Sequence, residues 1–201
     1  MVAMNKFSIM VSLGIIVLSS TSCAPVAVVA TGEVGASIAE ERTLGHIIDD
    51  ATIMAKIKNE FAQKDVANLL SKISVTVKEG RVLLTGSVAK NQHAIRAVKI
   101  AWSTEGVHEV INELEVGDKD IKTRANDSWI ATKVRTKLLF QKGVSSINYT
   151  VDVNNGVVYL IGIAKTKQEL DLAVRLASQV KGVKEVVSHM TLKSDPRRHK
   201  N

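Results

Sequence analysis

The chain contains one sequence pattern twice, with the second copy 76 or 77 positions after the first. The first copy opens near Asp50 and the second near Asp127. In each, a helix pattern, two strand patterns, a second helix pattern and an apolar strand follow. A period this long that occurs only twice is typical of two globular modules rather than of a solenoid. The repeat therefore predicts two small αββαβ modules, at residues 45–118 and 126–193.

The periodicity inside each copy supports this order of elements. Apolar residues recur every four positions in both opening helices, which predicts that each helix buries one face. A two-residue turn containing glycine then separates two alternating strands, as in a tight hairpin. The inward residues are Ile53, Ile57 and Phe61 in one copy and Ile130, Val134 and Leu138 in the other, and the turns are Glu79-Gly80 and Asn155-Gly156.

The segment before the first module has the layout of a secretory signal. Lys6 precedes an uncharged, mostly apolar run that ends in small residues, which predicts a signal peptide over residues 1–22. The one cysteine follows directly, so we expect a lipid anchor at Cys23 and a flexible tether over residues 23–44. The alternative is an ordinary cleaved signal that leaves a free thiol, because Ser20 stands where lipoprotein signals usually have leucine.

Glycines at fixed places in both copies connect the chain to a known family. They are Gly80 and Gly86, then Gly156 and Gly162, and the Gly-Val pairs at 106–107 and 182–183. This pattern resembles the BON domain. Two copies behind a lipoprotein signal, with the segment 126–139 opening the second, resemble the tandem BON-domain outer-membrane lipoproteins.

This resemblance implies an α+β fold in which each domain is a small three-stranded mixed sheet packed against two helices. It implies a non-enzymatic protein, lipid-anchored on the periplasmic face of the outer membrane, that binds anionic phospholipids such as phosphatidylglycerol and cardiolipin. It also implies support of outer-membrane integrity at division sites and a link to the β-barrel assembly machinery. A protein-interaction or chaperone-like adaptor of envelope assembly therefore remains the alternative function.

The formal net charge of +7 predicts an anionic partner. Residues 45–118 hold 9 basic and 10 acidic residues, whereas residues 126–193 hold 10 basic and 5 acidic residues. We therefore expect the second module to bind the anion. A polar connector over residues 119–125 and a basic tail over residues 194–201 flank it. Nucleic acid is excluded as a partner because a secretory signal removes the chain from it.

The opening helix of the second module combines aromatic and basic residues. If Ile130 faces inward, Trp129 lies about 100° around the helix, on a stripe of residues spaced by three or four. An exposed tryptophan beside cations is typical of a helix at a membrane interface. In the alternative interpretation, Trp129 packs between the modules and the lysines form a solvated face. The predicted lipid-binding residues are Trp129, Thr132, Lys133, Arg135, Thr136, Lys137, Leu139 and Phe140.

No residue pattern in the chain predicts catalysis, a metal site or a cofactor. The five histidines are scattered, without the spacing of a metal site. We expect His93 and His108 at the surface. We expect Trp102 to pack within the first module or between the modules, because Lys99 is its only basic neighbour in the sequence.

Overall fold

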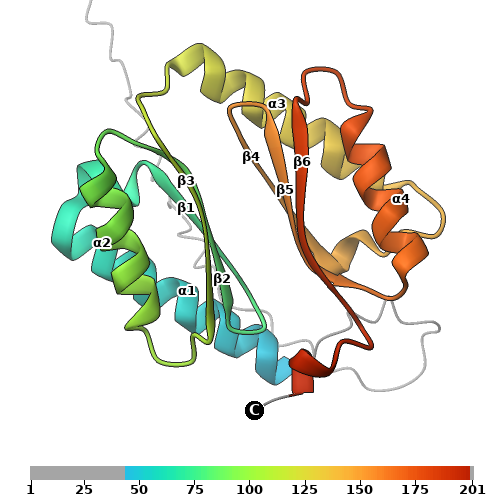
Figure 1. The fold of residues 1–201 in the computed structure, drawn as a ribbon, viewed down its shortest axis with the longest axis horizontal. Helices are drawn as coiled ribbons and strands as arrows, with labels where there is room; N and C mark the ends of the chain where they lie inside the picture. The colour runs from blue at the N-terminus through green and yellow to red at the C-terminus, as the bar shows by residue number, and fades with distance from the viewer. Residues whose placement is uncertain (1–43, 200–201) are drawn as a thin grey trace, which may run out of the picture. The chain divides into compact units, whose positions relative to one another are not determined.

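The computed structural model describes residues 44–199. Predictions for the signal peptide, Cys23 and the tether fall on residues outside this range. The first module contains α1 (Leu44–Asp65), the short π-helix η1 (Val66–Leu70), β1 (Ile73–Lys78), β2 (Arg81–Val88), α2 (Asn91–Trp102) and β3 (Glu109–Val116) (Figure 1). The second contains α3 (Ile121–Leu139), the 3-10 turn η2 (Ser146–Asn148), β4 (Tyr149–Asn154), β5 (Val157–Ala164), α4 (Lys167–Ser178) and β6 (Glu185–Leu192), and a last turn, η3 (Pro196–His199), follows.

Each module has one three-stranded mixed sheet, which confirms the predicted α+β fold. The central strand, β2 or β5, pairs antiparallel with the strand before it and parallel with the strand after it. The two sheets have the same register, since Ile73 pairs with Gly86 in one and Tyr149 with Gly162 in the other. The helices α2 and α4 form the crossovers that a parallel pair requires.

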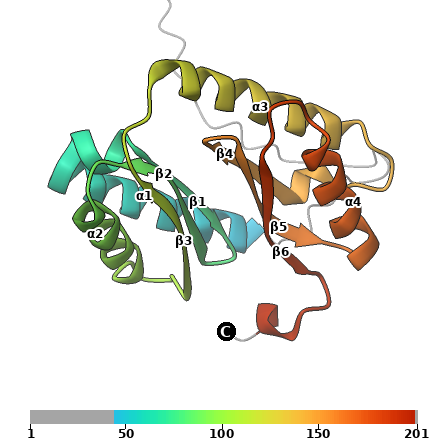
Figure 2. The ribbon, with the colours of Figure 1, turned by 45° about the horizontal axis from the view of Figure 1, so that its top comes forward.

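The core of each module lies between the sheet and its two helices. In Figure 2, α1 and α2 lie against β1–β3, and α3 and α4 lie against β4–β6. The inward residues predicted from the periodicity, among them Ile57, Phe61 and Val134, are completely buried. The two small cores therefore have the same construction.

A third buried cluster combines side chains from both modules. It consists of Leu83 of β2 with Tyr159 and Ile161 of β5, and Ile111 and Val187 pack against it. Polar contacts accompany it, because Thr85 donates to the carboxylate of Asp152. Burying this apolar surface favours a fixed association of the two modules over a loose linkage.

Glycine is required where the hairpins turn and where the strands approach other backbone. Both central turn residues have positive φ, 50° and 68° at Glu79 and Gly80 and 50° and 83° at Asn155 and Gly156, as in a type I′ turn. A Cβ at Gly86 would lie 2.2 Å from the carbonyl oxygen of Lys72. The close packing and the turns explain why both copies keep these glycines.

Three sequence-based expectations differ from the structure. Most of the segment predicted as a connector, residues 119–125, is helical, because α3 begins at Ile121. His93 is buried on the inner side of α2, at 8% exposure, so the prediction that it lies at the surface is wrong. Trp102 is half exposed rather than packed. Within the predicted basic tail, Arg198 in η3 forms an ion pair with Glu79 at 2.7 Å.

No helix between residues 44 and 199 is long and apolar enough to cross a membrane.

Candidate functional site

A buried aspartate fixes the start of the opening helix of each module against the hairpin. The two carboxylate oxygens of Asp50 accept hydrogen bonds from the backbone N–H groups of Glu79 and Gly80, at 2.8 and 2.9 Å. Asp127 accepts from Asn155 and Gly156 in the same way, both at 2.9 Å. We call this arrangement the turn clamp. It explains why the repeated pattern opens on aspartate in both copies.

In the second module the turn clamp also includes a lysine from the predicted connector. Lys119 forms an ion pair with Asp127, and its Nζ atom donates to Oδ1 of Asn154 at 2.8 Å. The side chains of both Lys119 and Asp127 are almost completely buried. The segment before α3 is therefore attached to the second module and orients the helix.

The start of α3 has its own cap. The side chain of Asp120 accepts a hydrogen bond from the backbone N–H of Thr123 at 2.7 Å. Hydrogen bonding by Thr123 lowers the pKa of Asp120, so the cap is charged at neutral pH. This cap places the first turns of α3 where the sequence predicted connector.

The outer face of α3 presents the aromatic residues predicted from the stripe. Trp129 is 45% exposed and Phe140 is 80% exposed. Lys133, one turn beyond the tryptophan, places its Nζ atom 5.8 Å from the centroid of the indole ring. Thr132 and Thr136 are exposed along the same stripe. We call this surface the α3 face.

The remaining predicted site residues lie beside this stripe. Leu139 is 63% exposed next to Phe140. Arg135 and Lys137 lie toward opposite flanks, and both are held by hydrogen bonds. An Nη2 group of Arg135 donates to the carbonyl oxygen of Val151 at 2.5 Å, and Lys137 donates to Gln179 at 2.9 Å. Lys133 is therefore the predicted cation most directly associated with the exposed aromatic residues.

The structure adds residues that the periodicity missed. The early start of α3 brings Ile121, which is 85% exposed, together with Lys122 and Arg124. Ile147 in η2 is a further exposed apolar side chain. The signal for the early start was Asp120, an N-cap residue before a segment without an apolar period. Between residues 121 and 142 the sole acid is Asp127, which is buried in the turn clamp.

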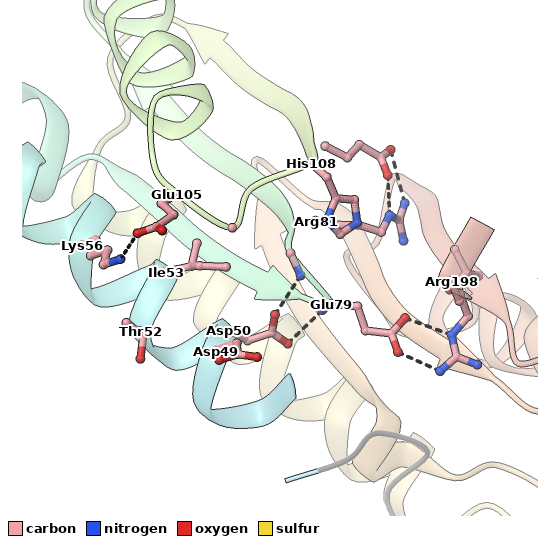
Figure 3. A pocket seen from close by; sticks show the side chains of 14 residues that line it. Asp49, Asp50, Thr52, Ile53, Lys56, Glu79, Arg81, Glu105, His108 and Arg198 are labelled. Atoms are coloured by element: carbon pink, nitrogen blue, oxygen red, sulfur yellow. Dashed lines mark hydrogen bonds and ion pairs between the residues drawn. The ribbon is translucent and has the colours of Figure 1, made fainter. Parts of the chain in front are cut away.

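The first module has a cavity of about 460 Å³ beside its turn clamp, shown in Figure 3. Its cations are already paired with protein carboxylates. Lys56 pairs with Glu105 at 3.2 Å, Arg81 with Glu109 at 2.5 Å, and Arg198 with Glu79 at 2.7 Å. An anionic ligand would have to displace these pairs, so the cavity is a weaker candidate than the α3 face.

A metal site has no support in residues 44–199, where no group of three or more histidine, cysteine or acidic side chains is arranged to hold an ion. His108 lies at the rim of the cavity and is exposed, as predicted.

Comparison with known proteins identifies relatives of both modules. The BON domain profile matches residues 49–118 and 126–194. An uncharacterized protein in the gshII 5′ region of Anaplasma centrale is 42% identical over 149 residues, which cover 73% of this chain and 96% of that protein. Outer membrane lipoprotein DolP of Haemophilus influenzae is 34% identical over 163 residues, with 80% and 84% of the two chains covered.

Osmotically-inducible protein Y of Escherichia coli is 34% identical over 154 residues, covering 75% of this chain and 76% of that protein. Among solved structures, the type III secretion protein CdsD of Chlamydia trachomatis is similar at 15% identity and a TM-score of 0.29. That alignment covers 71% of this chain and 63% of the other. The sequence relatives support a tandem BON-domain protein of the bacterial cell envelope.

Proposed function

Because the chain belongs to the BON-domain family, with one domain in each module, we propose that it is a non-enzymatic protein of the periplasmic face of the outer membrane. It binds anionic phospholipids, phosphatidylglycerol or cardiolipin, through the α3 face. The observation that carries this proposal is the exposed Trp129 beside Lys133 on a helix whose single acid is buried. Tryptophan prefers the headgroup region, and lysine and arginine meet anionic lipid there.

The expected strength of this contact is modest. A cation near an anionic membrane surface contributes about 1 kcal/mol, and added salt reduces this contribution. Lys122, Arg124, Lys133 and Lys142 are exposed in and just after α3, so electrostatics supply roughly 4 kcal/mol at most. A lipid anchor at Cys23 would keep the helix near the leaflet and make such weak binding sufficient. The relative DolP is named an outer membrane lipoprotein, which supports this arrangement.

Two equivalent substitutions test the proposal. The chain carrying Cys23→Ser, so that no anchor contributes, is sedimented with phosphatidylglycerol or cardiolipin vesicles. Trp129→Glu should lower binding about tenfold, since it removes the ring and adds a repelled charge. Thr52→Glu is the matched control, because Thr52 occupies the same position in α1 and is exposed. Unchanged binding of Trp129→Glu would show that α3 is not the lipid-contact helix.

We also propose that lipid binding localises the protein to division sites and supports outer-membrane integrity there. The Trp129→Glu strain should then lose both the localisation and the resistance of the envelope to detergents. If that variant keeps both and still co-purifies with the β-barrel assembly machinery, the adaptor function replaces the lipid-binding one.

A further inference from the structure

The second tryptophan of the chain lies on an exposed helix face of the first module. Trp102, the last residue of α2, is 50% exposed, and Ile95 on the same helix is 61% exposed. Lys99 lies between them in the sequence. The spacings of four and three residues place all three side chains on one face. Over this distance the helix rises about 10 Å, at 1.5 Å per residue.

A basic groove lies beside this face, between α2 and the end of α1. Its volume is about 480 Å³. No carboxylate lines it, and residues 89–104 contain three cations and no acid. The lining residues are Lys64, Gln92, Ile95, Arg96, Lys99, Ile100 and Ser103. We call this groove and the adjoining Trp102 the α2 surface.

Most of the cations that line this groove form no ion pair with the residues that the structure describes. Lys64 pairs with Glu60 at 3.0 Å. Within residues 44–199, neither Arg96 nor Lys99 forms an ion pair through its side chain. The hydrogen bonds that Asn68 donates to the carboxylate of Asp65, at 3.0 Å, are the main cause of its lowered pKa, and the charge of Arg96 contributes less. An incoming anion therefore finds positive charge that the protein does not already neutralise.

The equivalent helix of the second module lacks this surface. The positions of Ile95 and Trp102 are occupied in α4 by Asp171 and Ser178, and both are exposed. The α2 surface is therefore not a general feature of the fold. It lies in the first module, whose net charge is slightly negative. The net charge of the whole module therefore does not reveal this local group of cations.

We propose that the α2 surface is a second binding site for anionic phospholipid headgroups, separate from the α3 face. A lipid phosphate is held by Arg96 and Lys99, and the glycerol hydroxyls of phosphatidylglycerol meet Gln92 and Ser103. Ile95 and Trp102 enter the boundary of the acyl chains, where amphipathic helices bury their apolar face. The proposal takes from the proposed function only the presence of an anionic membrane near the protein, since its residues are different.

Fluorescence can test this site alone because the chain has only two tryptophans. In Trp129→Phe, Trp102 is the single indole, and the phenylalanine keeps an aromatic ring on α3. The full chain is mixed with vesicles of phosphatidylethanolamine and phosphatidylglycerol that carry brominated acyl chains on one lipid or the other. Trp102 should lose roughly half its emission with brominated phosphatidylglycerol, as expected for a ring at the boundary of the acyl chains, and clearly less with brominated phosphatidylethanolamine.

Matched charge reversals distinguish a site from general attraction. In the Trp129→Phe background, Lys99→Glu should remove most of the quenching. Arg175→Glu, at the equivalent position of α4, should leave the quenching within about a fifth of its starting value because Asp171 and Ser178 surround it. Equal loss in both variants would overturn the site. So would Trp102 emission that neither brominated lipid changes, which would favour an acidic protein segment as the partner.

The reciprocal variant separates this proposal from the first one. In Trp102→Phe the remaining Trp129 reports on the α3 face. Quenching of Trp129 without quenching of Trp102 supports the proposed function and overturns the second site. Quenching of Trp102 without quenching of Trp129 supports the second site and contradicts lipid contact by the α3 face.

Discussion

The two modules have the same interior but expose tryptophan and unpaired cations on different helices. In the second module the surface is on α3, the first helix, whereas α1 has Thr52 where α3 has Trp129 and Gln63 where it has Phe140. In the first module the exposed tryptophan and the unpaired cations are on α2, the second helix. Each module therefore has one basic helix bearing tryptophan, and the two helices are not equivalent in the fold.

This difference shows which residues determine the fold and which are available for function. The buried positions keep their chemistry in both copies, as with Ile53 and Ile130 or Asp50 and Asp127. The outward positions differ freely, because replacing exposed side chains has little effect on stability. The two BON domains therefore have the same core construction and two different surfaces.

The largest effect should come from the shared interior. Asp127→Ala removes the acceptor of two backbone N–H groups and leaves Lys119 buried without this partner, so the free energy of unfolding should fall by about 3–5 kcal/mol. Asp50→Ala also leaves two backbone N–H groups without their acceptor, so its loss should be about 2–3 kcal/mol. Urea denaturation of the full chain measures both. A large loss in only one variant would contradict the equivalence of the two turn clamps.

The next effect concerns two lysines at equivalent positions. Lys133→Glu changes the charge beside Trp129 by two units, which should weaken binding to phosphatidylglycerol vesicles by about 2 kcal/mol, or roughly thirtyfold. Lys56→Glu makes the same change in α1, where Lys56 already pairs with Glu105. It should reduce binding less than about twofold. Equal effects in a sedimentation assay would mean that only the net charge matters.

A pH effect distinguishes the central strands, where Tyr159 stands in place of Leu83. Burial, together with the nearby Glu113 and Glu115, raises the pKa of Tyr159 from 10.0 to about 12. Because the folded state favours the neutral phenol, its contribution is complete below pH 10 and is lost as the pH rises toward 12. The loss should approach about 2 kcal/mol.

Urea denaturation along this alkaline range measures that loss. Tyr159→Leu, which copies the first module, should remove this part of the pH dependence. If the variant and the parent chain lose stability in parallel, ionisation of other groups causes the effect.

The smallest effect should come from making α1 resemble α3. Thr52→Trp with Gln63→Phe gives α1 the two aromatic residues, but the lysine beside the new tryptophan, Lys56, is paired with Glu105. Binding to phosphatidylglycerol vesicles should rise only about threefold, because the apolar gain lacks an accompanying unpaired charge. Vesicles of phosphatidylcholine serve as the control for general stickiness. A gain as large as the loss in Trp129→Glu would show that aromatic residues alone are sufficient.

Most of the fold could be predicted because the buried faces leave a period in the sequence. The prediction failed where that period is absent. The first turns of α3, from Ile121 to Asn126, bury no side chain, so no apolar repeat marks them, and only the cap at Asp120 does. His93 is polar, yet it lies four residues before the buried Ala97 and so on the inner face of α2, and its burial follows from that position.

The candidate site was predictable in outline because exposure of α3 follows from the position of its buried residues. Trp129 is not part of the buried cluster between the two modules, which consists of Leu83, Tyr159 and Ile161. The α2 surface is not evident from the sequence, because Lys99 is the only basic neighbour of Trp102 along the chain and a tryptophan with so few cations beside it is expected to pack. That Lys64 of α1 comes close to Arg96 and Lys99 depends on tertiary packing, which no local pattern reveals.

The turn clamp has a consequence for how such duplicated domains diversify. In the hairpin turns, the hydrogen bonds of Asp50 and Asp127 go to backbone N–H groups, so they place no demand on the side chains of the turn. Glu79 is therefore available to pair with Arg198, and Asn155 to bond with Glu115. During evolution each copy could acquire its own neighbours at the hairpin tip while the same carboxylate kept the hairpin closed.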